Sequence, residues 1–393
     1  MPTQDEMTID ERRKYVKLME PRYRKSKRKE RSQLLSEMEQ VSKLHRKHLI
    51  RLLNGESLDR KKRSTPRSRR YGLEVERVVL RVWESLDYIC AERLTPSLVH
   101  MAQHLAGFGS VVLTAEVQSQ LSTISCATVQ RMLRKNRARK ARLPRPGPHR
   151  ANQVTKGVPM GRIPWNTPDP GHFETDLVHH GGESASGEYG YTLQLIDVAT
   201  GWSERVMLLG RGQLAMERAF TQVLERLPFA VKELHPDNGT EFFNYHLVRF
   251  WKERVSGVTL SRSRPYQKND NRNVEQKNDT LVRHYFGELR LDTAEQIAAG
   301  NVLYERMWLY YNLFQPVMHL SEKIVEGDKV RRKWDEAQTP YQRLLVTGVL
   351  SQEQQERLQA LYEQTNPLLL REEIYMGLAV LWEGALVQTG TAA

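Results

Sequence analysis

The 393-residue sequence predicts an α/β protein in which a mixed five-stranded sheet flanked by helices is preceded by all-α segments and followed by a helical C-terminal region. Three patterns predict this arrangement. Apolar residues recur at helical spacing in roughly the first 140 residues, alternate in strand-like runs from about residue 172 to 260, and return to helical spacing after residue 320. A chain of this length is expected to form two to four domains.

Residues 1–58 predict two helices with helix-turn-helix spacing, which break near residues 40–42 and end at Asn54 and Gly55. Cations on the second helix point away from its apolar stripe, where they could contact DNA phosphates or base edges. These cations are Lys43, Arg46, Lys47 and Arg51. A helical hairpin with a merely solvated basic face explains the same pattern. Residues 59–72 are too polar and basic to pack, and predict a linker that lies along DNA.

Residues 73–142 predict a second helical, helix-turn-helix-like DNA-binding domain. Pro96 is expected at the start of a helix, and Ser125 is expected to cap the last helix. Basic residues lie beyond the apolar face of this last helix, as on a recognition helix. The candidate DNA contacts are Arg131, Arg134 and Lys135. Prolines and glycines in residues 143–163 indicate a linker to the next domain.

Residues 164–320 predict the α/β domain. Strands are expected at 172–180, 188–200 and 201–210, then a helix at 213–227, a short strand ending at Pro236, a helix at 243–255, a strand from 257 and a helix at 273–286. This order predicts the mixed sheet with flanking helices. Residues 321–393 read as helical, and their apolar positions suggest packing within the chain or between subunits.

Three carboxylates lie on three of these expected elements. Asp176 lies inside a strand, where Asp is depleted unless it is paired or holds a metal. Asp237 follows a strand, and Glu275 lies in the first turn of a helix. Each has a structural explanation: a solvated strand face shared with Glu174, an Asp-Asn-Gly turn, and a favourable helix dipole. The ordered set, with 60 and 37 intervening residues, is the stronger signal.

Positive charge is concentrated in the first 150 residues. They contain 34 Lys and Arg against 16 Asp and Glu, a balance of +18, whereas the remainder has 26 against 31, a balance of −5. This asymmetry favours a polyanion bound mainly by the front half, with nucleic acid preferred over a membrane surface. A basic region that only aids solubility is the alternative.

Several classes of protein are not favoured. No run of 18 apolar residues predicts a membrane span, and the N-terminal residues lack the apolar core of a secretory signal. Cys90 and Cys126 have no spacing typical of zinc or disulfide frameworks, which favours a reducing cytoplasm. The sequence lacks a GxxxxGK[ST] segment, so ATP is not expected.

The order of a strand Asp, a post-strand Asp-x-Gly and a helix Glu resembles the DDE core of integrase-type transposases, relatives of retroviral integrases with a ribonuclease H-like fold. Residues 261–283, the Ala-Thr-Gly-Trp turn at 199–202 and residues 339–345 are similar to a group of bacterial insertion-sequence transposases. The resemblance implies metal-dependent cleavage of DNA at the element ends and transfer of the 3′-hydroxyl into target DNA. It also implies double-stranded DNA partners, namely terminal inverted repeats and target, a dimer or tetramer in the synaptic complex, and location at the bacterial nucleoid.

The resemblance further implies that Asp176, Asp237 and Glu275 are the catalytic residues and bind two Mg²⁺ or Mn²⁺ ions. Mg²⁺ prefers hard oxygen ligands, and two such ions stabilise the attacking and leaving oxygens of an in-line displacement. No covalent enzyme intermediate is required.

Cations near the Glu helix are expected to bind DNA. Lys277 and Arg283 lie on or near the face where the family contacts the DNA backbone, although many integrase-type cores carry the cation seven residues after the Glu, where this chain has Val282. The preceding loop adds the candidates Arg262, Arg264 and Lys268. A mobile solvated loop is the competing explanation for these last three.

Three histidines invite a functional role. His179 and His180 point to opposite faces of a strand and are interpreted as polar strand-end residues. His235 either orients DNA or Asp237, or is a strand-end residue. Two rival functions remain: a nuclease of the same fold that only hydrolyses, and a non-catalytic helix-turn-helix regulator.

Overall fold

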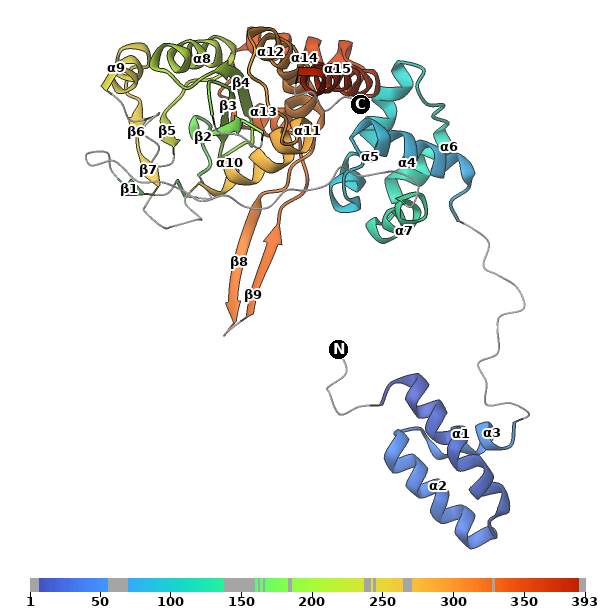
Figure 1. The fold of residues 1–393 in the computed structure, drawn as a ribbon. Coiled ribbons are helices and arrows are strands. Elements are labelled where there is room, and N and C mark those ends of the chain that lie inside the picture. Colours follow the sequence, from blue (N-terminus) through green and yellow to red (C-terminus); the bar gives the residue numbers. More distant parts are fainter. Residues whose placement is uncertain are drawn as a thin grey trace. The chain divides into compact units, whose positions relative to one another are not determined.

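The computed structural model describes residues 7–55, 70–137, 160–161, 163–164, 167–182, 186–236, 242, 245–263, 271–326 and 329–388. The chain divides into two compact units, Met1–Arg70 and Tyr71–Ala393. Figure 1 shows the elements of both, coloured along the sequence. Much of the two expected linkers, 59–72 and 143–163, lies outside the described residues.

The first unit contains helices α1 (Ile9–Lys25), α2 (Arg28–Ser42) and α3 (Arg46–Leu53). The predicted helix pair is confirmed by α2 and α3. Between them Lys43 adopts a left-handed conformation with φ 56°, and the ring of His45 caps α3 by accepting from the backbone nitrogen of Lys47 at 3.2 Å. The sequence pattern does not predict α1, because only Val16 and Tyr23 of its 17 residues are buried.

The second unit is built around the predicted five-stranded sheet. Its strands are β2 (His172–His180), β3 (Gly190–Asp197), β4 (Ser203–Leu209), β5 (Glu233–Pro236) and β6 (Thr259–Leu260). Their order is β4-β3-β2-β5-β6, with β2, β3 and β4 antiparallel and β5 and β6 parallel to β2. Helix α8 (Gln213–Arg226) leads from β4 to β5, and α9 (Tyr245–Arg254) leads from β5 to β6. This mixed sheet and its crossovers are the predicted ribonuclease H-like arrangement.

The two faces of the sheet are covered by different helices. On one face Phe173, Leu193 and Val206 join Phe220 of α8 and Trp251 of α9 in an apolar core. The opposite face contacts a helical segment that follows β6 and the short strand β7 (Arg262–Ser263). It consists of α10 (Arg272–Lys277), η1 (Asn278–Arg283), α11 (His284–Phe286), α12 (Ala294–Leu309) and η2 (Tyr310–Phe314). Because side chains alternate along a strand, this second face presents the residues next to those of the apolar core.

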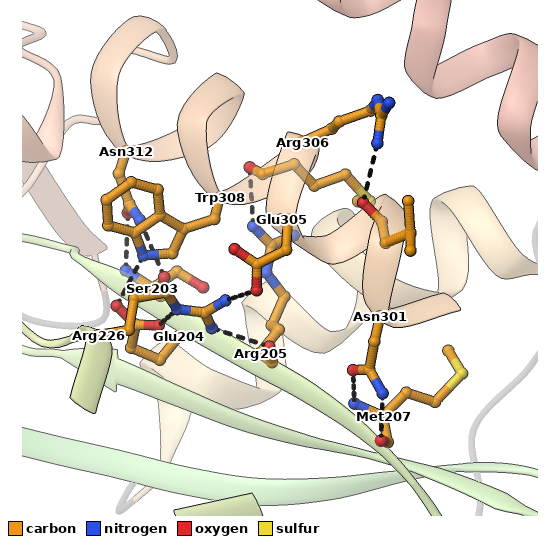
Figure 2. Close-up of polar contacts among 12 residues, drawn as sticks. Ser203, Glu204, Arg205, Met207, Arg226, Asn301, Glu305, Arg306, Trp308 and Asn312 are labelled. Carbon is orange, nitrogen blue, oxygen red and sulfur yellow. Dashed lines mark hydrogen bonds and ion pairs between the residues drawn. The ribbon is translucent and has the colours of Figure 1, made fainter. Parts of the chain in front are cut away.

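Strand β4 forms one edge of the sheet, and two asparagines bond its outer backbone groups (Figure 2). Asn301 accepts from Met207 N at 2.7 Å and donates to Met207 O at 2.8 Å. Asn312 makes the same pair with Ser203, at 2.9 and 3.0 Å. An unpaired edge exposes donors and acceptors that can pair with another chain. These side chains satisfy the edge and fix α12 and η2 against it.

Glu204 is a fully buried carboxylate with three donors, two of which, Arg226 and Trp308, are drawn in Figure 2. Arg226 Nε donates to it at 2.6 Å, Trp308 Nε1 at 2.7 Å and Trp202 Nε1 at 2.9 Å. A buried charge is tolerated only when it is paired. The turn that ends at Trp202, with Gly201 at φ 75°, therefore has a structural role in joining β4 to α8 and α12.

The remaining helices of this unit pack on the core. They are α4 (Leu73–Ser85), α5 (Ala91–Gly107), α6 (Ala115–Thr123), α7 (Cys126–Arg137), α13 (Pro340–Thr347), α14 (Gln352–Gln364) and α15 (Pro367–Gln388). Tyr310 Oη donates to Ser85 O at 2.7 Å, and Tyr362 Oη bonds His100 Nε2 at 2.7 Å. Residues 73–137 thus belong to the same compact unit as the sheet. None of the helices in the described ranges has the length and apolar character needed to cross a membrane.

Two local predictions are wrong. Pro96 lies inside α5 rather than at its start, because the chain breaks earlier, at Asp87 and Tyr88, which have φ of 54° and 59°. Residues 320–334 form a hairpin of β8 (Leu320–Glu326) and β9 (Lys329–Trp334) rather than helix. In Figure 1 this hairpin extends away from the sheet. The helical C-terminal region is confirmed from Pro340 onward.

Candidate active site

Asp176 lies half-buried on the polar face of β2. Its carboxylate accepts from Leu177 N at 2.8 Å and from Asn278 Nδ2 at 2.6 Å. Asn278 follows α10 directly and lies three residues after Glu275, whose side chain is exposed. Residues three apart on a helix are neighbours on one face. The bond from Asn278 therefore brings the carboxylate of Asp176 to the helical face that carries Glu275.

Glu174 fixes the start of α10 against β2. Its carboxylate is 3% exposed and accepts from Asn273 N at 2.6 Å, Val274 N at 2.9 Å and Asn273 Nδ2 at 2.8 Å. A carboxylate at a helix N-terminus satisfies unpaired N–H groups and interacts favourably with the helix dipole. Burial raises the pKa of Glu174 to about 7, and the hydrogen bonds from Val274 and Asn273 limit the rise. The interpretation of Glu174 as part of a solvated face is wrong, because α10 covers it.

A third bond completes the attachment, since Asn271 Nδ2 donates to Thr175 O at 3.2 Å. Three successive residues of β2, namely Glu174, Thr175 and Asp176, thus bond the segment from Asn271 to Asn278. Glu275 lies within that segment, on a helix held to the strand both before and after it.

Asp237 lies outside the described residues, so its predicted role is not tested by its own position. The strand that precedes it is described. Parallel strands β2 and β5 pair Glu174 with His235 and Thr175 with Pro236. In the sequence, Thr175 immediately precedes Asp176, and Pro236 immediately precedes Asp237.

Buried amide groups surround Asp176. Gln194 lies opposite Asp176 on β3 and is fully buried. Among the described residues, neither polar atom of the Gln194 amide has a hydrogen-bond partner, and the same holds for Oδ1 of Asn271 and of Asn278. Most buried polar atoms in proteins have a partner. The concentration of such atoms beside one carboxylate marks this part of the sheet as a place suited to a polar ligand.

The donor set at this place is compatible with a hard divalent cation. The carboxylates of Asp176 and Glu275 and the amide oxygen of Asn278 are oxygen donors, which Mg²⁺ and Mn²⁺ prefer over sulfur. Within the described ranges, which omit Asp237, no group of three or more His, Cys, Asp or Glu side chains could hold a metal ion.

Comparison with known proteins adds the family. No family model matches the chain. The "Uncharacterized protein y4rM" of Sinorhizobium fredii (strain NBRC 101917 / NGR234) is 36% identical to it over 330 residues, which cover 82% of this chain and 92% of that protein. This chain belongs to the y4rM family. Among solved structures, the catalytic core domain of BIV integrase is 18% identical, covers 45% of this chain and 95% of its own, and has a TM-score of 0.29.

The cation expected seven residues after Glu275 is displaced by the π-helical segment η1. A π-helical turn takes up one more residue than an α-helical turn. Because η1 lies between Glu275 and Arg283, the eighth residue comes close to the direction that the seventh has in an uninterrupted α-helix. Val282 is fully buried in the core, whereas Arg283 is half-buried. This y4rM family member thus carries its cation on the side of the helix that bears Glu275.

Lys277 is less exposed than predicted. It is half-buried rather than exposed, and its Nζ lies 4.8 Å from the ring centroid of Tyr311. Burial, followed by the charges of Arg93 and Arg205, lowers the pKa of Lys277 to about 7. The aromatic contact and the turn of the helix toward the core explain why Lys277 is not presented to solvent.

The loop before α10 is described only at its start. Arg262 is 6% exposed in β7 (Arg262–Ser263), which pairs with β1 (Met160–Gly161). Arg262 therefore does not lie in a solvated loop, which is the alternative explanation, and its contact with DNA stays a prediction. Arg264 and Lys268 lie outside the described residues.

The histidines have structural surroundings. His179 is exposed and His180 is buried, which confirms that they point to opposite faces. His180 Nε2 bonds Thr192 Oγ1 at 2.8 Å, and burial lowers the pKa of His180 to about 3, with smaller effects from His179 and Arg283. His235 is buried on β5, where Nδ1 bonds Ser261 Oγ at 2.6 Å. It joins β5 to the segment after β6.

The candidate DNA contacts of the helical segments are mostly on the surface. Arg46 is the exception in the first unit, because its guanidinium bonds Ser36 Oγ at 3.0 Å and Ser32 Oγ at 2.8 Å on α2. Ser125 Oγ accepts from Thr128 N at 3.3 Å, which confirms the predicted cap of α7. The exposed candidates are Lys43, Lys47 and Arg51 in the first unit, and Arg131, Arg134 and Lys135 on α7.

Proposed function

We propose that this protein is a DDE-type DNA transposase that cleaves DNA at the ends of an insertion sequence and joins the freed 3′-hydroxyl to target DNA. One observation supports this activity most directly. The bonds from Glu174, Thr175 and Asp176 hold the helix of Glu275 along the strand of Asp176. Pro236, which pairs with Thr175, immediately precedes Asp237 in the sequence, so we expect Asp237 to join the same group.

Asp176, Asp237 and Glu275 would hold the divalent cations, Mg²⁺ or Mn²⁺. When bound, such ions stabilise the attacking and leaving oxygens of a phosphoryl transfer. Other side chains of the protein orient the carboxylates that would bind the cations. Asn278 restrains the carboxylate of Asp176, and Glu174 fixes the helix that presents Glu275. In this chemistry the nucleophile is water in the first step and the DNA 3′-hydroxyl in the second.

DNA recognition would come from the helical segments. Exposed cations on α3 and α7 follow buried apolar faces, as expected for helices that lie on a polyanion. We expect these segments to bind the terminal inverted repeats and Arg283 to bind the backbone near the reacting phosphate. Pairing of two element ends requires a homo-oligomer, a dimer or a tetramer.

The test is cleavage and joining by the full-length protein, with Mg²⁺ and DNA that carries the sequences flanking its own gene. Asp176→Asn and Glu275→Gln are expected to abolish both reactions while DNA binding is retained. Asp279→Asn is the matched control, because Asp279 is an exposed carboxylate four residues after Glu275. Cleavage by Asp176→Asn at the wild-type rate would contradict the assignment.

A substrate with a pre-cut end separates the rival functions. Joining of its 3′-hydroxyl to a second DNA supports the transposase. Hydrolysis without joining indicates a nuclease of the same fold, and binding with neither reaction indicates a regulator.

A further inference from the structure

Strands β8 and β9 form a two-stranded ribbon that has no third strand among the described residues. We call residues 320–326 and 329–334 the arm. At about 3.3 Å per residue, its strands are roughly 20 Å long. An isolated hairpin of this size is marginally stable in water, so a projecting ribbon suggests contact with a partner.

Three consecutive cations are exposed on one strand of the arm. Arg331, Arg332 and Lys333 are all exposed on β9. Lys333 makes only a long ion pair of 3.9 Å with Glu322, and both side chains are largely exposed. Successive residues of a strand point to opposite faces, so Arg332 lies on one face of the ribbon and Arg331 and Lys333 lie on the other. Both faces therefore carry positive charge.

The register leaves one cation of the arm without an opposite charge directly across the ribbon. Glu322 lies opposite Lys333, whereas Arg331 lies opposite the apolar Ile324. A polyanion would neutralise the positive charge of Arg331 and of its exposed neighbours.

The base of the arm is held firmly to the catalytic unit. Asp335 accepts from His319 N at 2.7 Å and forms an ion pair of 2.7 Å with Arg343 on α13. Val317, just before the arm, belongs to the same small apolar cluster as Val274, the residue before Glu275. The arm thus starts from the same small core that supports the helix of the candidate active site.

We propose that the arm binds double-stranded DNA alongside the candidate active site. This inference rests on the proposed function only in taking DNA as the substrate. The major groove is wide enough for a two-stranded ribbon, and cations on both faces suit the two phosphate backbones that line a groove. A second copy of the chain is a poorer fit. Among the arm residues whose side chains the structure describes, the exposed apolar ones are Ile324 and Trp334, which are 39% and 47% exposed and lie on opposite faces of the ribbon.

The experiment measures how the affinity of the full-length protein for a labelled DNA duplex depends on salt, with Ca²⁺ in place of Mg²⁺. In wild type, log affinity falls linearly with log salt concentration, and each phosphate contact contributes about 0.9 to the slope. Arg331→Ala with Arg332→Ala is expected to reduce the slope by about 2. Arg331→Lys with Arg332→Lys keeps the charge and is expected to retain the wild-type slope.

The matched control is Arg218→Ala with Arg357→Ala, which removes two exposed cations from α8 and α14 and should leave the slope unchanged. An unchanged slope in the Ala variant of the arm overturns the inference, even when Mg²⁺-dependent cleavage is intact. A reduced slope supports it, even if the wild type cleaves nothing and the proposed function fails. If the Ala variant changes the oligomeric state and not the slope, the arm is a subunit contact and the inference is wrong.

Discussion

The two faces of the central sheet differ in what their residues contact. Phe173, Leu193 and Val206 face α8 and α9 through apolar contacts alone, whereas the alternate residues Glu174 and Asp176 face α10 through hydrogen bonds. Because the same strand supplies both faces, one residue of β2 contributes to stability and the next positions a carboxylate. The comparison indicates that apolar packing on one face stabilises the sheet, and that the other face uses this stable sheet to position its carboxylates.

The largest expected effect is a loss of DNA cleavage without a matching loss of stability. Asp176→Asn should reduce Mg²⁺-dependent DNA cleavage by roughly a thousandfold or more, since several kcal/mol of charge stabilisation is lost and each 1.4 kcal/mol corresponds to about tenfold. The unfolding midpoint in urea should change little, because the amide retains the shape of the carboxylate. A large loss of stability would show instead that Asp176 is a structural residue.

Phe173→Ala tests the other face. Removing this fully buried ring should lower the free energy of unfolding by about 3–5 kcal/mol. The variant that remains folded at low temperature should still cleave DNA, since the polar face keeps its bonds. Urea unfolding and cleavage of the same preparation check both expectations. An inactive but fully stable variant would contradict this division between the faces.

Glu174→Ala tests the hydrogen bonds that join the polar face of the sheet to the helix of Glu275. It leaves the N–H groups of Asn273 and Val274 without their acceptor, which should cost about 2 kcal/mol of stability. Cleavage should fall with a larger effect on kcat than on DNA affinity, because the helix is no longer held at its start. Glu217→Ala, at an exposed position on α8, is the control and should behave as wild type.

Acid should destabilise the protein through buried histidines. Burial lowers the pKa of His319 to about 4, with Arg343 contributing next, against about 6.5 in the unfolded chain. A lowered pKa gives stability that is present above about pH 6.5 and is lost as pH falls toward 4. Between pH 7.5 and 5, His319 should account for about 2 kcal/mol of that loss.

The measurement is the difference in urea unfolding between wild type and His319→Gln at the two pH values. Glu174 acts in the opposite direction, because its pKa is raised to about 7, so the difference between proteins isolates the histidine. Equal pH dependence in the two proteins would contradict the lowered pKa of the half-buried His319.

The smallest effect concerns the sheet edge. Asn301→Ala removes two bonds to the backbone of Met207 and should cost about 1 kcal/mol. Val302→Ala is a suitable control, because Val302 is 55% exposed on the same helix. Light scattering of the two variants would show whether an uncovered β4 also promotes association.

The sequence predicts the order of strands and helices in the core because alternation and helical spacing are local properties. The position of Asp176 on a strand and of Glu275 in a first helical turn follow from the same patterns. The burial of Glu174 depends on a helix about 100 residues later in the chain, so no local pattern reveals it. The partial burial of Lys277 is not evident from the sequence for a similar reason, since Tyr311, which it contacts, is distant in sequence.

The sequence contains a hairpin signal for the arm, which its basic residues obscure. Gly327 and Asp328 form a dipeptide typical of a two-residue hairpin turn, between runs that contain Ile324 and Val325 on one side and Val330 on the other. The basic residues of the second run make it resemble a solvated helix. The π-helical segment η1, which turns Arg283 rather than Val282 toward the side of Glu275, has no comparable signal. It changes the directions in which the side chains point without changing the composition of the helix.

The convergence of three carboxylates is tested most directly by replacing Mg²⁺ with Fe²⁺ and ascorbate, which cleave the backbone close to a bound ion. We predict cuts near residues 176, 237 and 275 in the wild-type protein, all suppressed by excess Mg²⁺ and all lost in Asp176→Asn. Cuts confined to one of these segments, or cuts that persist unchanged in Asp176→Asn, would contradict a shared metal site.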